Sequence, residues 1–395
     1  MKITIVVGGR WHAFDLAKEL HKRGYLHKLI TTYPKFKTRQ WDIPDENVIS
    51  LPISLIIEKV IFKFTKSQIL LRKIQHLLLK IFSFSASFYL DGSDIIHGWS
   101  GFSLDSINWA KKKKVPFILE RGSSHTLFQE NLLFKEHKLL NIPFIRSNKT
   151  VTKKELLEYE LCNKVQIPSL FVKKSFLKHK YPIKKLNLNN FGANLKDFNI
   201  GKKSDNLFRV VYAGSLSLRK GIIYLLEAFQ DAQIKNSELI ILGSLDRNIS
   251  QFIQKDIPGV KFYGHVPQKK LLSYYINSDV FVMPSIEEGM AMVQIQAMAC
   301  GLPLICTTNT GGEDLLRLTG KAKKISEEII EYPAGYLVDY GNSKSIKDCL
   351  KLMSNDKNLL QSKKHNTLKI RKKYLGWENY ASRTIELYKK VSNEK

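Results

Sequence analysis

The sequence predicts an α/β protein made of two doubly wound domains, each built on a mostly parallel sheet. Its 395 residues exceed what one ordinary core accommodates. Short β-branched runs alternate with helical periodicities in both halves. Residues 187–206 lose this rhythm and gather Asn, Gly and Lys, as domain linkers do. We therefore expect domains over 1–200 and 207–372, and a closing helix over 373–395 that packs back on the N-terminal domain.

Composition and charge indicate where in the cell the protein works and which partners it has. Four cysteines are scattered without metal-ligand spacing, which predicts reduced thiols in an intracellular protein. The first residues, MKITIVVGGR, form a strand rather than a leader peptide, and charges interrupt every long apolar run. The net charge of +27 is spread over both halves without a nucleic-acid-binding module. We expect a cytoplasmic protein with no nucleic-acid partner, which can contact an anionic membrane surface peripherally.

The N-terminal half begins with a strand over 3–9, a helix over 10–25 and a second strand over 27–34. The glycine pair that ends the first strand lets a ligand approach the backbone at Gly9, although a plain turn explains it equally well.

Residues 51–90 carry lysines and arginines through an aliphatic and aromatic run that is almost free of acids. This pattern is typical of an amphipathic helical pair. It fits core-packing helices with snorkelling lysines, and it also fits contact with a lipid surface; both can hold together.

Three more strands follow over 93–100, 115–125 and 163–171. His97 and His125 lie just past strand ends, where ligand sites of open parallel sheets collect. We expect His97 to support other groups from behind rather than to act directly.

In the C-terminal half, the strand FRVVYAG ends at Gly214 and is followed by the loop SLSLRKG and a helix. Later strands are expected over 238–244, 260–267, 280–285, 302–308 and 334–341, with the closing helix at 377–391.

Residues 281–315 form the central element: a buried strand, a polar loop that contains Glu287 and Glu288, and a short helix closed by Gly301. Free backbone N–H groups and the helix dipole attract an anion at such a loop. A phosphorylated ligand is therefore expected here.

Several ordered motifs resemble one family. They are VVGG, YAGSLSLRKGIIYLLEAF, EEGMAMVQIQAMACGLPLI, the glycine pair 311–312, AGYLVDYG and the final WENY helix. Together they resemble the GT-B glycosyltransferases of family 4, the group 1 transferases. The resemblance implies two Rossmann-like domains that face a central cleft, with the acceptor held by the first and the nucleotide sugar by the second.

The resemblance implies a cation pair for the donor diphosphate. Lys220 matches the family's lysine, whereas Ser215 stands where an arginine is usual. Arg219 is a candidate for the second cation, and a solvated loop end is the alternative for it. Cations suit this place because the leaving diphosphate gains negative charge in the transition state.

The family signature is a glutamate, seven residues and a second glutamate. Glu288 matches the first, which touches sugar hydroxyls, while Gln296 replaces the second, which holds the ribose. An amide accepts with one atom only, so binding is softened by roughly 1 kcal/mol. Glu287 is expected to face solvent.

The remaining donor contacts are implied to come from backbone groups. The amides of Met290, Ala291 and Met292 would approach the diphosphate, and the loop at Val266 would contact the nucleobase. Gly9 would line the donor site from the first domain.

His125 is the best positional match to the family's histidine near the reacting carbon, with Arg121, Ser123 and Ser124 as alternatives. His12 is a lesser candidate. The implied reaction is transfer with retention from a nucleotide-diphosphate sugar to a glycan or lipid-linked acceptor, with His125, Glu288 and Lys220 in the catalytic roles.

No metal or other cofactor is expected, since no paired carboxylates or His/Cys cluster suit a divalent cation. The setting would be surface polysaccharide, lipopolysaccharide or other glycolipid biosynthesis. Alternatives are a nucleotide-sugar epimerase of the same fold, and an inactive relative or non-catalytic polyanion or nucleic-acid binder.

Overall fold

The computed structural model describes residues 1–52, 57, 61, 68–253 and 256–394. Part of the predicted amphipathic pair, namely residues 53–56, 58–60 and 62–67, lies outside the described residues. Within the described part of the chain, no helix is both long and apolar enough to cross a membrane.

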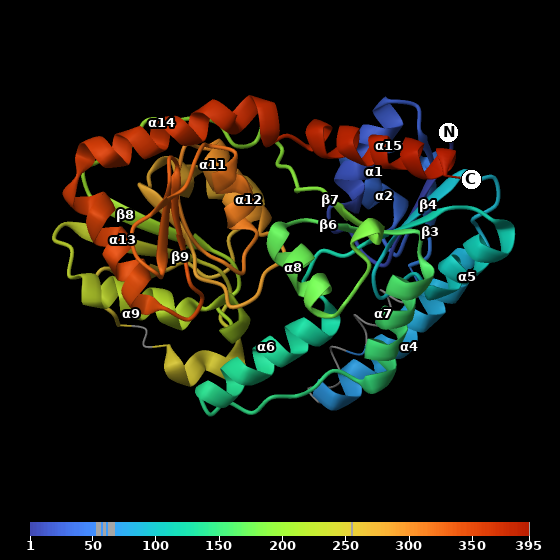
Figure 1. The fold of residues 1–395 in the computed structure, drawn as a ribbon, viewed down its shortest axis with the longest axis horizontal. Helices are drawn as coiled ribbons and strands as arrows, with labels where there is room; N and C mark the ends of the chain where they lie inside the picture. Colours follow the sequence, from blue (N-terminus) through green and yellow to red (C-terminus); the bar gives the residue numbers. More distant parts are fainter. Residues whose placement is uncertain (53–56, 58–60, 62–67, 254–255, 395) are drawn as a thin grey trace.

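The first sheet has seven parallel strands in the order β3-β2-β1-β4-β5-β6-β7 (Figure 1). Its strands are β1 Ile3–Val7, β2 Leu26–Thr31, β3 Val48–Ser50, β4 Ile95–Trp99, β5 Phe117–Glu120, β6 Lys164–Ile167 and β7 Leu186–Leu188. Strand β1 is fully buried, as expected for its continuous β-branched run ITIVV with helices on both faces. The helices are α1 Ala13–Lys22, α2 Lys35–Thr38, α4 Gln68–Ser87, α5 Leu104–Lys113, α6 Thr126–Leu139, α7 Lys149–Leu161 and α8 Leu170–Lys178.

The second sheet has eight strands in the order β10-β9-β8-β11-β12-β15-β14-β13, and only the pairs that involve β14 are antiparallel. Its strands are β8 Phe208–Ala213, β9 Ser237–Leu242, β10 Val260–Phe262, β11 Val280–Met283, β12 Leu304–Thr307, β13 Lys323–Lys324, β14 Ile329–Tyr332 and β15 Gly335–Val338. The helices are α9 Ile222–Ala232, α10 Leu271–Ile276, α11 Met292–Ala299, α12 Gly312–Arg317, α13 Ser343–Asn355 and α14 Lys357–Tyr374. The predicted fold, two Rossmann-like sheets in one chain, is confirmed.

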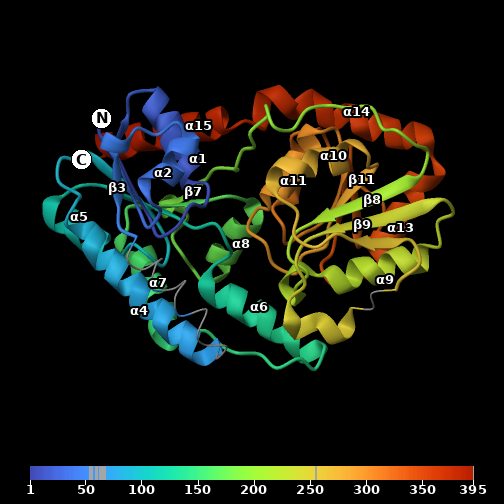
Figure 2. The same cartoon turned by 180° about the vertical axis from the view of Figure 1, so that it is seen from behind.

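The last two helices link the two sheets. In both views α14 runs along the C-terminal domain, and α15 (Trp377–Asn393) lies over the N-terminal domain beside α1 (Figures 1 and 2). The apolar face of α15 is buried, including Trp377, Tyr380 and Tyr388. Arg23 of the N-terminal domain donates to the backbone carbonyl of Glu378. The chain therefore crosses back from the second domain to the first between α14 and α15, and α15 packs on the first domain.

Among the differences from the sequence prediction, two lie in the first domain around β6 and β7. Residues 186–188 form the edge strand β7 where a linker was expected, and Asn187 donates its side-chain amide to Gln166 on β6. Strand β6 ends at Ile167, short of the predicted 171, because Ser169 caps α8 by accepting from Val172. In both places polar side chains that resembled loop residues make specific local hydrogen bonds.

Candidate functional site

The candidate site lies at the topological switch points of the two sheets. In the second sheet β8 is flanked by β9 and β11, so the chain changes direction there, as it does between β1 and β4 in the first. Loops at the carboxyl ends of such strands diverge and leave room for a ligand. The loops after β8 and β11 contain the predicted donor residues.

These two loops are locked together through their backbones. The 3₁₀ turn η4 (Leu218–Lys220) ends at Gly221, whose φ is 62°, and a Cβ there would lie 2.0 Å from the Pro284 carbonyl oxygen. Only glycine fits both constraints. The amide of Ile286 donates to the carbonyl of Arg219 at 2.9 Å. This packing fixes the two cationic side chains next to the glutamate pair.

Lys220, Arg219 and Glu288 form one charged cluster. The Lys220 Nζ lies 2.5 Å from Glu288 Oε2, and Arg219 Nη2 lies 3.1 Å from the same oxygen. Ser215 stays outside the cluster: it is exposed, and its carbonyl accepts from the Tyr212 hydroxyl. The structure therefore brings together the lysine and the neighbouring arginine of the predicted pair.

Glu287 corrects the sequence prediction, because it is completely buried rather than solvent-facing. Its Oε1 accepts from the backbone N–H of Ser124 at 3.0 Å and from its hydroxyl at 2.7 Å. Its Oε2 accepts from Gln129 Nε2 and from Arg219 Nε, each at 2.7 Å. Glu287 thus carries a hydrogen-bond network from the second domain to the first.

The charge on Glu287 is stabilised by its partners. Burial alone would raise the pKa of Glu287, but Arg219 and the Ser124 donors outweigh it and hold the pKa below its ordinary value. Burial would conversely lower the pKa of Arg219, and Glu288 and Glu287 raise it instead. Both groups are therefore ionised at neutral pH.

The two domains also touch through backbone. A Cβ on Gly289 would lie 1.9 Å from the carbonyl oxygen of Gly122, and the Gly289 carbonyl accepts from Ser169 Oγ at 2.6 Å. Asp314 of α12 accepts from the amide of Leu170, the first residue of α8. The glycine of the EEG loop is thus required by close approach to the N-terminal domain.

The predicted amide cradle opens α11. Met290 and Ala291 are buried, and no described residue accepts a hydrogen bond from the amides of Met290, Ala291 or Met292. Gln296, one turn further along α11, is also buried, and its Oε1 has no hydrogen-bond partner among the described residues. The three backbone amides and the Gln296 oxygen therefore have no hydrogen-bond partner among the described residues, in the segment that follows Glu288.

His125 is positioned by packing inside the N-terminal domain. Its backbone N–H donates to Ser175 Oγ at 2.8 Å, and its ring stacks on His179 with centroids 4.2 Å apart. Burial, together with His179 and Arg121, lowers its pKa to about 3, so the ring is neutral. Its neighbour Ser124, not His125, makes the described contact with Glu287. A catalytic role for His125 stays a prediction.

His12 and His97 lie in a buried network beneath α15. The Glu120 carboxylate lies 3.1 Å from His12 Nε2 and 3.1 Å from His97 Nε2, although the first pair lacks hydrogen-bond geometry. The Tyr380 hydroxyl donates to Glu120, and Tyr388 OH lies 2.6 Å from His97 Nδ1. Burial would raise the pKa of Glu120, yet the two histidines lower it to about 2. The network ties α15 to the first sheet.

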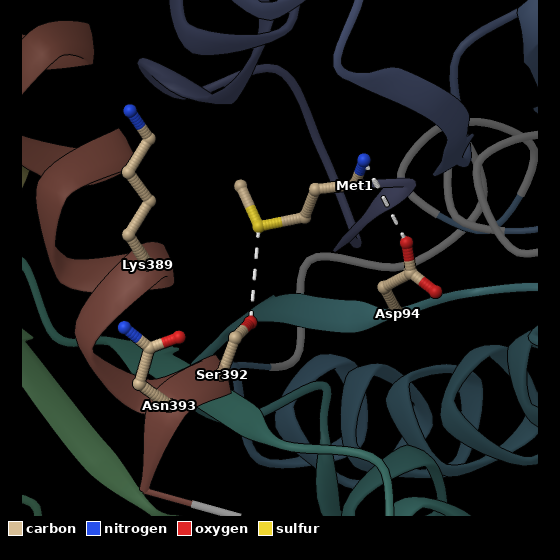
Figure 3. Close-up of a pocket in the computed structure, with 5 residues that line it drawn as sticks. All are labelled: Met1, Asp94, Lys389, Ser392 and Asn393. Atoms are coloured by element: carbon tan, nitrogen blue, oxygen red, sulfur yellow. Dashed lines mark hydrogen bonds and ion pairs between the residues drawn. The ribbon is translucent and has the colours of Figure 1, made fainter.

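Two other predicted positions are peripheral to the charged cluster. Val266 is half-buried in the loop after β10, and the Gly9 carbonyl accepts from Thr31 Oγ1 at 3.0 Å. A surface hollow shown in Figure 3 lies near the chain ends, where the Met1 amino group pairs with Asp94. That hollow lies near the amino ends of β1 and β4, whereas the charged cluster lies at carboxyl ends of strands in the other sheet.

Comparison with known proteins finds a family model that matches the second domain. Residues 194–370 match the family model described as glycosyl transferases group 1. The chain is 30% identical over 171 residues to the capsular polysaccharide biosynthesis glycosyltransferase CapM of Staphylococcus aureus, a match that covers 41% of this chain and 40% of CapM. This part of the chain is therefore similar to the glycosyl transferases group 1 family.

Solved structures agree with the fold of this chain. Sucrose-phosphate synthase from Thermosynechococcus elongatus superposes with a TM-score of 0.72 at 19% identity, over 100% of both chains. Anabaena HepE, solved in complex with UDP, has a TM-score of 0.68 at 15% identity and covers 99% of this chain and 100% of its own. At such identities the likeness shows the fold, and the CapM alignment spans less than half of that relative.

Within the region that matches the family model, the chain has Lys220 and Glu288, and Gln296 stands in place of the second signature glutamate. In the part of the chain that the structure describes, no group of three or more His, Cys, Asp or Glu side chains could hold a metal ion. Glu287 was missed because its partner Ser124 lies 163 residues away in sequence. Two successive glutamates in one loop were the available signal, since neighbouring side chains point in different directions.

Proposed function

We propose that the protein is a retaining glycosyltransferase that moves a sugar from a nucleotide-diphosphate sugar to a hydroxyl of a glycan or lipid-linked acceptor. The proposal rests chiefly on the cluster of Lys220 and Arg219 beside Glu288, next to three unpaired amides at the start of α11. Cations and backbone N–H groups at a helix N-terminus suit a diphosphate that gains charge as it leaves. UDP in the complex of the structural relative HepE supports the same ligand class.

The residues have distinct roles in this proposal. The diphosphate competes with Glu288 for Lys220 and Arg219, which frees the Glu288 carboxylate to accept from sugar hydroxyls. Gln296 offers its unpaired Oε1 to one ribose hydroxyl. The neutral His125 of the first domain faces the acceptor in this proposal.

The biological setting of the reaction is proposed from a relative of the chain and from its net charge. CapM acts in capsular polysaccharide biosynthesis. We place the present chain in surface-polysaccharide or glycolipid assembly, in the cytoplasm and peripherally at the inner face of the cytoplasmic membrane. The net charge of +27 favours an anionic surface.

A thermal-shift screen with UDP-, GDP-, ADP- and dTDP-linked sugars tests donor binding. A ligand at 100 times its dissociation constant adds about 2.7 kcal/mol of stability. We expect one nucleotide class to stabilise the wild type and the Lys269→Ala control, because Lys269 is exposed on the 3₁₀ turn η6 (Gln268–Lys270), away from the described ion pairs. Lys220→Ala should abolish the shift. No shift with any donor would contradict the proposal.

Transfer itself is tested with the donor that binds. Glu288→Gln should bind nucleotide but lose most sugar transfer, because a neutral amide accepts through one oxygen only and more weakly than a carboxylate. The anomeric configuration of the product, read by NMR, distinguishes retention from inversion. Free sugar product formed at the full rate without any acceptor would favour the epimerase alternative.

A further inference from the structure

Helix α4 is apolar on two opposite faces. Its inner face buries Leu78, Phe82 and Ala86 against the first domain. On the outer side, four large apolar side chains recur at spacings of four, three and four residues; helical spacing places the first three on one face of α4, and the fourth directly follows the helix. We call this set the outer stripe; the exposed fractions are Leu77 56%, Ile81 41%, Phe84 58% and Phe88 65%.

The outer stripe is ordered and continuous. Phe84 and Phe88 pack edge to face with ring centroids 4.9 Å apart. In both views α4 lies along the outer edge of the N-terminal domain (Figures 1 and 2). Scattered exposed apolar residues are normal on a protein surface, but a contiguous stripe indicates an interaction surface.

The charge around the stripe indicates the kind of partner. Residues 68–90, which include α4 and the turn after it, contain three Lys or Arg and no Asp or Glu. Lys80 is exposed within the helix one position before Ile81, and four exposed lysines (111–114) end the neighbouring helix α5. A second copy of this chain would bring like charges together. An anionic surface with an apolar interior complements both features.

We infer that the outer stripe of α4 inserts into the interface of an anionic lipid bilayer, with the surrounding lysines at the level of the headgroups. Aromatic and aliphatic side chains enter the headgroup and acyl boundary, while lysine stems snorkel to the phosphates. Binding of this kind holds the N-terminal domain at a membrane and does not depend on sugar transfer.

Vesicle co-sedimentation of the full chain tests the inference, with phosphatidylcholine vesicles that contain or lack one third phosphatidylglycerol. We expect wild type to bind the anionic vesicles and to release as salt rises. The double variant Phe84→Ser, Phe88→Ser should partition at least about tenfold less, because two aromatic side chains no longer enter the interface. Phe36→Ser is the matched control, a phenylalanine 61% exposed on α2 of the same domain.

A labelled variant covers the case in which the double variant fails to fold. The four native cysteines are buried, so an environment-sensitive dye reacts with Phe88→Cys selectively. Its emission should shift to the blue with anionic vesicles, and the same dye at Phe36→Cys should not. Equal vesicle binding by the wild type and the double variant, or no shift at Phe88→Cys, overturns the inference. A concentration-dependent dimer lost in the double variant would assign the stripe to self-association instead.

Discussion

Replacing Glu287 by Gln should open the contact between the two domains. In the wild type this buried carboxylate accepts from Ser124 twice, from Gln129 and from Arg219. A glutamine keeps one oxygen for Ser124, but its NH₂ group then faces the donors of Gln129 and Arg219. Hydrogen bonds to charged groups are worth about 1.5–3 kcal/mol each. Because the Gln129 amide can flip and restore one bond, we expect a net loss of about 2 kcal/mol.

Hydrogen exchange at the Ser124 amide measures this loss directly, since its acceptor belongs to the other domain. A loss of 2 kcal/mol corresponds to roughly thirtyfold faster exchange. Amides of the central strands β4 and β11 should keep their protection, which separates domain opening from unfolding. Glu238→Gln is the control, because Glu238 pairs with Arg209 and Lys261 within the second domain.

The pH dependence follows from the lowered pKa of Glu287. Its contribution is fully present above the ordinary glutamate pKa and is lost only as pH falls through the lower folded value. Ser124 should therefore stay protected in mildly acidic buffer. An unchanged Ser124 exchange rate in Glu287→Gln would refute the assignment of Glu287 as an interdomain tether.

Three further predictions concern other contacts. Gly289→Ala should abolish transfer while the protein stays folded, because the new Cβ meets the Gly122 carbonyl oxygen at 1.9 Å; half of wild-type activity would contradict this. Tyr388→Phe should lower the free energy of unfolding in urea by about 1–3 kcal/mol, since it leaves the buried His97 Nδ1 unpaired; an unchanged midpoint would contradict it. Burial raises the pKa of Glu158 to about 7. Its contribution to the free energy of unfolding is therefore fully present below the pKa that Glu158 has in the unfolded chain, and it is lost as the pH rises through 7. Thermal melts at pH 5.5 and 8 should show this decline in the wild type, and a smaller one in Glu158→Gln; equal declines would contradict the assignment.

The fold was accessible from the sequence because local patterns determine most of it. Strand Ile3–Val7 is a β-branched run and Val280–Met283 an apolar run, and both form strands as predicted; both are buried, which was predicted for the second. The short antiparallel strands β13 and β14 were not predicted, because KK and IIEY carry little periodicity and pair only through tertiary contact. Local propensity thus sufficed for the central strands and failed at the sheet edge.

The site residues could be predicted from the sequence only where a local motif contains them. Lys220 and Glu288 came from two motifs, and the structure places their charged atoms together because β8 and β11 are neighbours in the sheet. The burial of Glu287 depends on loops of both domains, and no local pattern encodes such a meeting. His12 was a candidate because it lies in the loop after the glycine pair. In the structure it lies beside Glu120 and belongs to the buried network under α15. Residues that act across domains are therefore the ones that sequence patterns miss.

The two adjacent glutamates divide one loop between two tasks. Glu287 turns toward the first domain and Glu288 toward the cations of the second, and Arg219 contacts both carboxylates. A diphosphate that draws Arg219 and Lys220 away from Glu288 must also change the ion pair between Arg219 and Glu287. Donor binding and domain contact would then be coupled through a single guanidinium, and in Arg219→Lys, which lacks the forked geometry, the two should respond separately. A Ser124 exchange rate that falls with added nucleotide in the wild type but not in Arg219→Lys would establish that coupling; the same response in both would exclude it.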